Sequence, residues 1–568
     1  MRAYQAIVPQ GARASLVAKG SARLGAIDLS LEALAVRRES ELQFYPSIVS
    51  GWMGATHPEN PYDVPVHVDA LLAGLPAQRY RVETVSTRSA VALGGSWGRW
   101  TYDAFIVGAN EEAKAQLRNL PDPAAIAQAL IAEEPSDALS LYSTSRAVAV
   151  PEHLLEDGPV ERYMANASQV QASLRGPLLQ LPAGALSCNV GVDYRRELMG
   201  FNLRLKDADR AVMSSFAACR VPLIDSNMSF PVIEALDLGL GIRGDNYSDI
   251  GRVTKQQFGV SWQMTDSLRW QASRAESFRP PSLAELYWRR VVAPMVIYDP
   301  KRDETAPITI TTGGNPQLRA TSRQSSSVSV SFQPRESWQL SAEYWRIKTR
   351  GHIAALAPGT LLAYEDFVLP GRILREPPSA EDARMGRPGK LSWLDVSRAN
   401  VGGATTQGVD LSAEAVFTTS VGTFQPRLLM SLTDKFLYSD LPIRNSWWED
   451  RAGTASEFGT IPKKRAIASL TYTRNQWRAS VHARVISSYR DRDLITGEPM
   501  QRRVSGGAVW DLHVARDIGN HFRFTAGAFN VTNEEPPFAH VGGSLGFDPS
   551  QGDLAGRQIY GRLSAAFD

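Results

Sequence analysis

The 568-residue sequence predicts an all-β protein: a transmembrane antiparallel β-barrel with short periplasmic turns at one end and long extracellular loops at the other. Three observations predict this fold class. Apolar and polar residues alternate with a period of two along the chain, the alternating runs extend over about 9–11 residues, and short turns alternate with long loops. Strands of soluble proteins are typically about 5–6 residues long, so the run length favours strands that cross a membrane at a tilt.

The clearest alternating run is 185–195, where apolar residues occupy the even positions and polar or charged residues most of the odd ones. The runs 236–242, 327–332 and 409–417 repeat this split. One face of such strands is expected to meet lipid and the other to line the lumen. The charged residues of the polar phase that are expected to line a polar path are Asp193, Arg195, Arg243, Asp410 and Glu414.

The connections between these runs are of two kinds. Short turns are predicted near Gly25, Gly94–Gly98, Pro182–Gly184, Thr265–Ser267, Pro334–Ser337, Ser420–Thr423, Arg474–Gln476 and Ile518–Asn520. Long loops, rich in Pro, Gly and charge, are predicted at about 39–77, 110–160, 277–320, 351–404, 439–462, 488–507 and 533–557. A compact soluble domain rarely contains so many loops longer than about 15 residues. Within one loop, Asp122–Glu134 opens with Asp-Pro and has apolar residues near helical spacing, which predicts a short helix.

These turns and loops predict roughly 19 strands. The first, near Ala14–Leu24, and the last, Gln558–Phe567, both run toward the side of the short turns. Single-chain bacterial barrels have an even number of antiparallel strands, so we expect this chain to begin partway round a barrel. Residues 1–12 are interpreted as an N-terminal lead that contains part of a strand, and residues 13–568 as the barrel domain.

Composition excludes several other classes of protein. The chain has 61 Lys and Arg against 59 Asp and Glu, a formal net charge of +2, which argues against a dedicated nucleic-acid binder. Mean hydropathy is −0.22 and no run of about 18 apolar residues occurs, so no transmembrane helix is predicted. The first twenty residues lack the apolar core of a secretory signal peptide.

The two cysteines, Cys188 and Cys219, exclude a disulfide scaffold and a cysteine-rich metal site. Both fall on the apolar phase of neighbouring predicted strands. Free thiols are favoured, because a separation of 31 residues leaves the register undetermined. A cross-strand disulfide is the alternative.

Motifs that resemble catalytic signatures lie in the wrong structural context. Gly94–Gly98 and Gly542–Gly546 fit G-x-S-x-G, but a nucleophile elbow needs a strand before the serine and a helix after it. Gly239–Gly244 fits G-x-G-x-x-G, yet these glycines lie inside an alternating run. We therefore predict no enzyme, no catalytic residue and no cofactor.

The eight histidines are scattered, so a metal site would require them to converge in space, and none is predicted. Two of them, His482 and His513, lie on predicted strands and are interpreted as lining the lumen.

Seven segments, in order, resemble motifs of the TonB-dependent outer-membrane receptors. The segment Ala272–Tyr287 (ASRAESFRPPSLAELY) is similar to a strand-to-loop signature of that family. The others are Asn60–Val68 (NPYDVPVHV), Leu236–Gly251 (LDLGLGIRGDNYSDIG), Asn315–Gln324 (NPQLRATSRQ), Asn400–Phe417 (NVGGATTQGVDLSAEAVF), Phe529–Pro537 (FNVTNEEPP) and Gly546–Phe567 (GFDPSQGDLAGRQIYGRLSAAF). One departure is the absence of the family's Glu after Arg319, where Ala320 and Thr321 stand.

The resemblance implies a 22-stranded barrel in the outer membrane of a Gram-negative bacterium. It implies uptake of a scarce solute such as a siderophore, a metal chelate, cobalamin or a carbohydrate. The family's signal peptide, TonB box and plug domain are not recognised here. We therefore expect a truncated receptor that lacks energised transport on its own, because the TonB complex would act only through the plug.

The resemblance also implies partners, which are outer-membrane lipid and a small-molecule ligand, with no nucleic acid. Ligand contacts are expected in loops 39–77, 277–320 and 351–404. Three alternatives to the truncated receptor are a passive porin-like channel, a non-functional fragment of a split gene, and a soluble β-rich enzyme or adhesin.

Overall fold

The computed structural model describes residues 9–44, 48–71, 76–140, 154–202, 205–355, 357–366, 369, 371–439, 448–456, 459–493, 499–519, 521–552 and 554–565. Strands dominate and the described helices are short, so the predicted all-β class is confirmed. No described helix has the length and apolar content that crossing a membrane requires.

One sheet contains 21 strands, and the strand pairings recorded for it are antiparallel. Its strands are β1 (Gln10–Leu24), β2 (Ile27–Gln43), β5 (Arg79–Trp97), β6 (Trp100–Arg118), β9 (Glu161–Leu181), β10 (Gly184–Phe201), β11 (Leu205–Ile224), β12 (Ala235–Tyr247), β13 (Gly251–Thr265), β14 (Leu268–Arg279), β17 (Thr321–Arg335), β18 (Trp338–Ala354), β21 (Ala399–Ala415), β22 (Phe417–Thr419), β23 (Gly422–Ser439), β24 (Glu449–Asp450), β25 (Lys464–Arg474), β26 (Trp477–Ile486), β29 (Gly507–Ile518), β30 (Phe522–Phe529) and β31 (Gln558–Ala565). Only β22 and β24 have three residues or fewer, which leaves the predicted 19 long strands.

Short turns join these strands where the sequence predicts them. Gly25, Gly98 and Asn475 occupy three of the turns with positive φ, a conformation that glycine and asparagine adopt most readily. The turn between β11 and β12 is longer than the others and contains the 3₁₀ helix η2 (Ser226–Met228), which was not predicted. Part of the turn near Ile518–Asn520 and the end of the last predicted strand lie outside the described residues.

The chain divides into two compact units. The first comprises residues 1–94, 104–170 and 195–210, and the second comprises 95–103, 171–194 and 211–568. The predicted division at residues 12 and 13 falls inside β1 and stays a prediction.

In the first unit, two long loops carry a small core of their own. Loop 39–77 contains the hairpin β3 (Ile48–Met53) and β4 (Val66–Leu71). Loop 110–160 contains β7 (Leu120–Pro121), β8 (Leu155–Glu156) and helix α1 (Pro123–Ile131), which confirms the predicted helix. The Asp122 side chain caps α1 by accepting from the amides of Ala124 and Ala125. Residues of both loops share one buried cluster: Val49, Ile126, Ala129, Leu130, Leu139 and Leu154.

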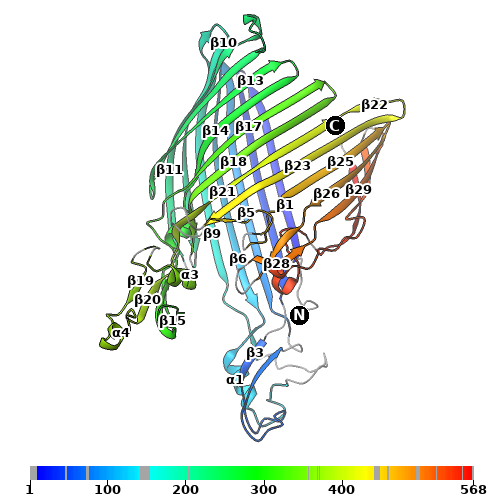
Figure 1. Cartoon of the computed structure of the whole chain (residues 1–568). Helices are drawn as coiled ribbons and strands as arrows, with labels where there is room; N and C mark the ends of the chain where they lie inside the picture. Colours follow the sequence, from blue (N-terminus) through cyan, green and yellow to red (C-terminus); the bar gives the residue numbers. More distant parts are fainter. Residues whose placement is uncertain are drawn as a thin grey trace. The chain divides into compact units, whose positions relative to one another are not determined.

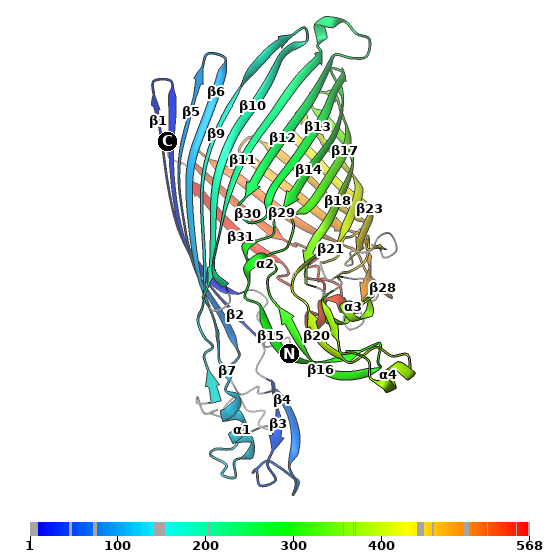
Figure 2. The ribbon, with the colours of Figure 1, turned by 90° about the vertical axis from the view of Figure 1, so that its left-hand side faces the viewer.

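In the second unit, the strands of the large sheet from β12 to β14, with β17, β18, β21, β23, β25, β26 and β29, lie side by side (Figures 1 and 2) and have two different faces. In the β12–β13 pair, Arg243 lies opposite Lys255, whereas Leu240 lies opposite Phe258. Leu240 and Phe258 are 50% and 53% exposed, so the apolar phase faces outward. We call the face that carries Arg243 and Lys255 the polar face. This is the alternation that a membrane barrel requires.

The long loops of the second unit contain the remaining elements. These are α2 (Leu283–Tyr287), β15 (Val291–Asp299), β16 (Glu304–Thr312), α3 (Pro358–Ala363), β19 (Ile373–Arg375), α4 (Ala380–Arg384), β20 (Leu391–Asp395), β27 (Tyr489–Arg492), β28 (Pro499–Val504) and η3 (His540–Leu545). In Figures 1 and 2 the loop elements β15, β20 and α4 gather at one end of the strands, and Figure 1 shows the short hairpin of β22 and β23 at the other end.

The prediction of free thiols is wrong. Cys188 on β10 and Cys219 on β11 form a disulfide, and their Cα atoms are 4.1 Å apart. The two strands are neighbours in the sheet, and Cys219 lies opposite Leu240 on the apolar phase. Residues directly opposite one another without mutual hydrogen bonds approach to about 4.5 Å in antiparallel pairs, which brings two thiols within bonding reach.

Candidate ligand-binding surfaces

A charged cluster on the polar face joins β10, β11 and β12. The Arg243 guanidinium donates to Asp193 Oδ2 at 2.8 Å and forms an ion pair with Asp245, also at 2.8 Å. Ser214 Oγ donates to Asp245 Oδ1 at 2.7 Å. Both carboxylates are buried, whereas Arg243 is 39% exposed. The two carboxylates therefore fix the position of a guanidinium that remains accessible.

A cavity of about 480 Å³ lies beside this cluster, with Phe216, Arg243, Lys255, Gln257 and Phe278 in its lining. Gly241 also lines it, and a Cβ at that position would lie 2.6 Å from the Gln257 side chain, so a larger residue would fill the space. Lys255 Nζ donates to Ser322 Oγ, and no ion pair with an acidic side chain is found for it among the described residues. The lining thus combines the aromatic rings of Phe216 and Phe278 with two cationic side chains and one carboxylate, that of Glu276. The cationic groups and the rings are suited to an anionic ligand with aromatic groups.

The other predicted lumen charges have partners of their own. Asp410 accepts from Ser431 Oγ at 2.6 Å, and Glu414 pairs with Arg427 at 2.7 Å across β21 and β23. In the first unit, Arg195 pairs with Glu197 at 2.6 Å. Asp193 and Arg243 are therefore the two predicted charges that the structure shows in direct contact.

A second surface is formed where loops 277–320 and 351–404 pack together. Strands β15, β16, β20 and β19 form a four-stranded sheet in this order, and β16 pairs with β20 in parallel. Helix α3 covers a core that both loops share: Ala306, Ile308, Ile310, Leu361, Leu362, Leu391, Leu394, Val396, Ala399 and Val401. We call the assembly of β15, β16, α3, β19, α4 and β20 the loop module.

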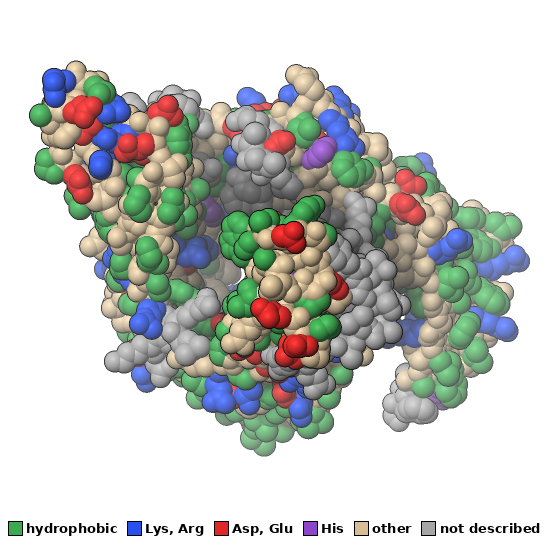
Figure 3. All heavy atoms as spheres, turned by 90° about the horizontal axis from the view of Figure 1, so that it is seen from below, with side chains coloured by type: hydrophobic (Ala, Val, Ile, Leu, Met, Phe, Trp, Pro, Cys, Tyr) green, Lys and Arg blue, Asp and Glu red, His purple; other side chains and the backbone are tan. Residues whose placement is uncertain are grey.

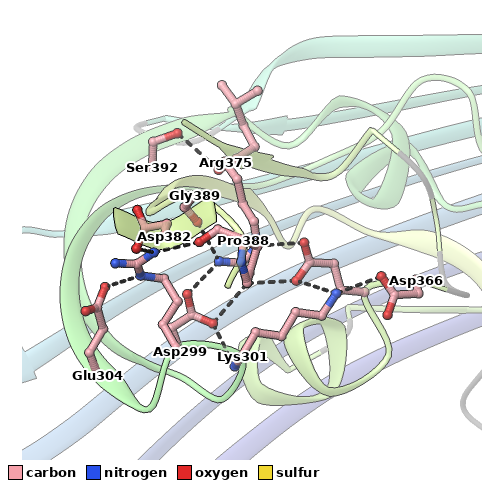
Figure 4. Close-up of polar contacts among 12 residues, drawn as sticks. Asp299, Lys301, Glu304, Asp366, Arg375, Asp382, Pro388, Gly389 and Ser392 are labelled. Atoms are coloured by element: carbon pink, nitrogen blue, oxygen red, sulfur yellow. Dashed lines mark hydrogen bonds and ion pairs between the residues drawn. The ribbon is translucent and has the colours of Figure 1, made fainter. Parts of the chain in front are cut away.

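An ionic network ties the two loops of the module together (Figure 4). Arg375 on β19 donates to both oxygens of Asp299 on β15, at 2.6 and 2.9 Å, and to both oxygens of Glu365, at 2.7 and 2.8 Å. Lys301 reaches Asp366 at 2.7 Å. Asp299 is fully buried and Arg375 is 11% exposed, so the pair is removed from water.

A second arginine makes a parallel connection. Arg302 donates to Glu304 at 2.6 Å, to Asp382 on α4 at 2.8 Å and to the Pro388 carbonyl at 2.6 Å. Asp382 also accepts from Ser379 Oγ at 2.7 Å in a capping box at the start of α4. These contacts place α4 against the segment that links β15 to β16.

The ionic network lowers the pKa of two of its carboxyl groups, those of Asp299 and Asp382. Hydrogen bonds from Ser379 and Arg302 lower the pKa of Asp382 to about 2. Burial alone would raise the pKa of Asp299, but the hydrogen bonds and charge of Arg375 outweigh it, and that pKa lies below its ordinary value. An aspartate in an unfolded chain titrates near pH 4, so both groups stabilise the folded module while they are ionised.

We expect the loop module to lose stability as the pH falls from about 4 to about 2. A depressed pKa contributes stability that is present above the unfolded value and is lost as the pH falls through the folded value. Pulsed hydrogen exchange, read by mass spectrometry on peptides from 291–312 and 371–395, should show protection that falls over this range. Peptides from β26 serve as the control, and equal loss of protection there would contradict the assignment to the module.

The structure also tests the motifs that sequence analysis rejected. Gly94–Gly98 lies at the hairpin of β5 and β6, and Gly239–Gly244 lies inside β12, so neither is followed by a helix. Of the three loops where ligand contacts were predicted, 277–320 and 351–404 come together in the module, whereas 39–77 packs with 110–160 in the first unit. Phe216 and Lys255 could not be recognised as cavity residues from the sequence, because no local motif marks them. Phe278, in contrast, lies in the signature segment Ala272–Tyr287 and in the predicted ligand loop 277–320.

Acidic and basic side chains are interspersed over the face drawn in Figure 3. Within the described ranges, no group of three His, Cys, Asp or Glu residues is arranged to hold a metal ion. The predicted absence of catalytic and cofactor residues stays a prediction.

Solved structures with the same fold are outer-membrane receptors. A variant of the ferric enterobactin receptor PfeA from Pseudomonas aeruginosa matches with a TM-score of 0.60 and 11% identity, over 99% of this chain and 78% of that one. The siderophore receptor PirA from Acinetobacter baumannii matches with a TM-score of 0.60 and 10% identity, over 99% and 78%. The FrpB iron transporter from Neisseria meningitidis matches with a TM-score of 0.56 and 12% identity, over 97% and 72%. At these identities the likeness shows the fold.

No curated protein matches the chain significantly. The family model described as "TonB dependent receptor-like, beta-barrel" matches residues 143–531, which is more than half of the chain. Members and structural neighbours of this family are receptors and transporters, and the family is found in the outer membrane of Gram-negative bacteria. The antiparallel sheet, with its outward apolar phase and inward charges, is therefore the transmembrane barrel of that family, and the chain belongs to the TonB-dependent receptor-like β-barrels.

Proposed function

We propose that this protein is an outer-membrane receptor that binds an anionic metal chelate of the siderophore class and takes part in its uptake. The observation that carries the proposal is the cavity on the polar face, where Lys255 and Arg243 lie beside Phe216 and Phe278. Lys255 supplies the positive charge that attracts a negatively charged chelate, Arg243, whose charge Asp193 and Asp245 offset, can donate hydrogen bonds to it, and the aromatic rings contact its organic part. The family and the siderophore receptors among its neighbours support this choice of ligand.

The membrane contact and the energy source of this receptor are proposed as follows. The exposed apolar phase, with residues such as Leu240 and Phe258, is proposed to contact outer-membrane lipid. Energised uptake is proposed to require the TonB complex, acting through a plug domain as in the family.

Replacing Lys255 by alanine is expected to weaken binding of a ferric siderophore roughly 10- to 100-fold, because a charge-assisted hydrogen bond contributes about 1.5–3 kcal/mol. Quenching of tryptophan fluorescence of the full chain in detergent, with ferric enterobactin as the probe, measures the affinity. One neighbouring structure of PfeA contains enterobactin, which makes this chelate a reasonable first probe.

Lys464→Ala is the matched control, because Lys464 is exposed and lies opposite Leu432 on the apolar phase. Equal affinities for the wild type and the Lys255 variant would contradict the assignment of the cavity. If the wild type bound neither ferric enterobactin nor a panel of ferric hydroxamates, the siderophore proposal itself would be wrong.

A further inference from the structure

Two histidines and a tyrosine gather on the polar face of β26, β29 and β31, in the second unit. The ring centres of His482 and His513 are 5.5 Å apart. His513 Nδ1 is 2.8 Å from the hydroxyl of Tyr560, within hydrogen-bond distance. All three side chains are partly exposed, so a small ion can reach them.

The strand register explains why these residues meet. His513 lies opposite Ser480 on β26 and opposite Gly527 on β30, and Gly527 in turn lies opposite Tyr560 on β31. His482 lies opposite Asp511, two residues before His513 on the same strand, so the two histidines are diagonal neighbours. Strand β30 separates β29 from β31, so His513 and Tyr560 must meet across it.

Gly527 leaves the space for that contact. A Cβ at this position would lie 2.6 Å from His513 Nδ1 and 2.8 Å from Tyr560 Cε1, closer than real Cβ atoms approach. A side chain here would therefore separate the two residues. Because Gly527 has no side chain, His513 and Tyr560 can form their hydrogen bond across β30.

Neighbouring groups hold the rings in place. Phe529 stacks on Tyr560 with ring centres 5.2 Å apart and contacts the edge of His513, also at 5.2 Å. Asp511, which lies opposite His482, is 7% exposed and accepts from the Asn530 amide at 2.8 Å. The site is thus ordered by packing before any ligand binds.

We propose that His482 and His513 bind a divalent transition-metal ion, with Tyr560 as a positioning residue. Imidazole nitrogen is a preferred ligand of Cu²⁺, Ni²⁺ and Zn²⁺. Two imidazoles that share one ion at about 2.0–2.1 Å have ring centres roughly 5–6 Å apart, which agrees with the observed separation. Water or an incoming ligand would complete the coordination, because these two histidines supply only two positions.

Tyr560 acts through the second nitrogen of His513. When Nδ1–H donates to the tyrosine oxygen, the tautomer is fixed and Nε2 keeps its lone pair for the metal. In the strand order β26, β29, β30, β31, Tyr560 and His482 lie on opposite sides of His513. The hydrogen bond therefore directs Nδ1 toward Tyr560, and the proposed site uses Nε2 as the metal ligand.

Copper titration of the full chain in detergent, followed by electron paramagnetic resonance, tests the proposal. The wild type is expected to bind one Cu²⁺ per chain with hyperfine coupling to two nitrogens. His482→Asn and His513→Asn should each lose that two-nitrogen signal. Tyr560→Phe and Gly527→Ala should keep it but lower the affinity roughly 10- to 100-fold, since both remove the hydrogen bond that orients His513. His540→Asn, which lies in an exposed loop, is the control and should change neither the two-nitrogen signal nor the copper affinity.

Thermal unfolding of each variant separates loss of the site from loss of the fold. A two-nitrogen signal that survives in the doubly substituted His482→Asn, His513→Asn chain would place the copper elsewhere and overturn the proposal. Failure of the folded wild type to bind copper stoichiometrically at micromolar concentration would overturn it as well. An unchanged copper affinity in the folded Tyr560→Phe variant would show that Tyr560 does not position His513. The proposal does not rest on siderophore binding, and Lys255→Ala should leave the copper signal unchanged.

Discussion

Replacing Arg375 by alanine is expected to open the loop module while the barrel strands remain paired. The guanidinium makes four hydrogen bonds to two carboxylates, those of Asp299 and Glu365, and a fifth to the Gly389 carbonyl at 3.1 Å. Its removal leaves two negative charges close together and largely out of water. Breaking a buried ion pair by removing one partner costs about 3–5 kcal/mol, so the loop module of the variant should open far more often than that of the wild type.

Hydrogen exchange of the full chain measures this effect locally. Protection of peptides from 291–312 and 371–395 should fall by roughly two to three and a half orders of magnitude, the equivalent of 3–5 kcal/mol. Arg384→Ala is the matched control, because Arg384 is exposed on α4 and donates only to the Ala380 carbonyl among the described contacts. Unchanged protection in the Arg375 variant would show that the apolar core around Leu394 holds the module without the ionic network.

Removing the Cys188–Cys219 disulfide is expected to lower the free energy of unfolding by about 4 kcal/mol. The bond closes a loop with a sequence separation of 31 residues, and the chain-entropy relation assigns about that much stabilisation to a loop of this length. Because the effect acts on the unfolded chain, it does not require any change in the folded β10–β11 pair. The folded structure of the variant should therefore be unaltered.

Urea unfolding of the doubly substituted Cys188→Ala, Cys219→Ala chain in detergent tests this expectation against the oxidised wild type. A reducing agent should shift the wild-type transition toward that of the variant and leave the variant itself unmoved. Coincident transitions for oxidised wild type and variant would mean that the unfolded barrel is already restrained by other means.

Much of the fold follows from local patterns. Alternation with a period of two places Leu240 and Arg243 on opposite faces of β12, and the structure has them there. Turn residues such as Gly25 and Asn475 mark the hairpins because their conformations are local properties. Helix α1 was predictable for the same reason, since the adjacent residues Asp122 and Pro123 form a helix start signal.

The parts that could not be predicted depend on register between strands. The pairing of Cys188 with Cys219 and the meeting of His482 with His513 both require a register between strands that the sequence alone does not fix. The loop module is a stronger case, because Asp299 and Arg375 come from loops separated by two strands. Only the location of the long loops was visible in the sequence, and their mutual packing was not.

The parallel pairing of β16 with β20 has a consequence for the order in which the chain assembles. Strands β17 and β18 lie between β16 and β20 in the chain, so Thr309 and Trp393 can pair only when a loop of many residues has closed. Closing such a loop is entropically costly until the intervening hairpin has formed and brought the ends together. The module should therefore be one of the last parts of the second unit to fold, after β17 and β18 have paired.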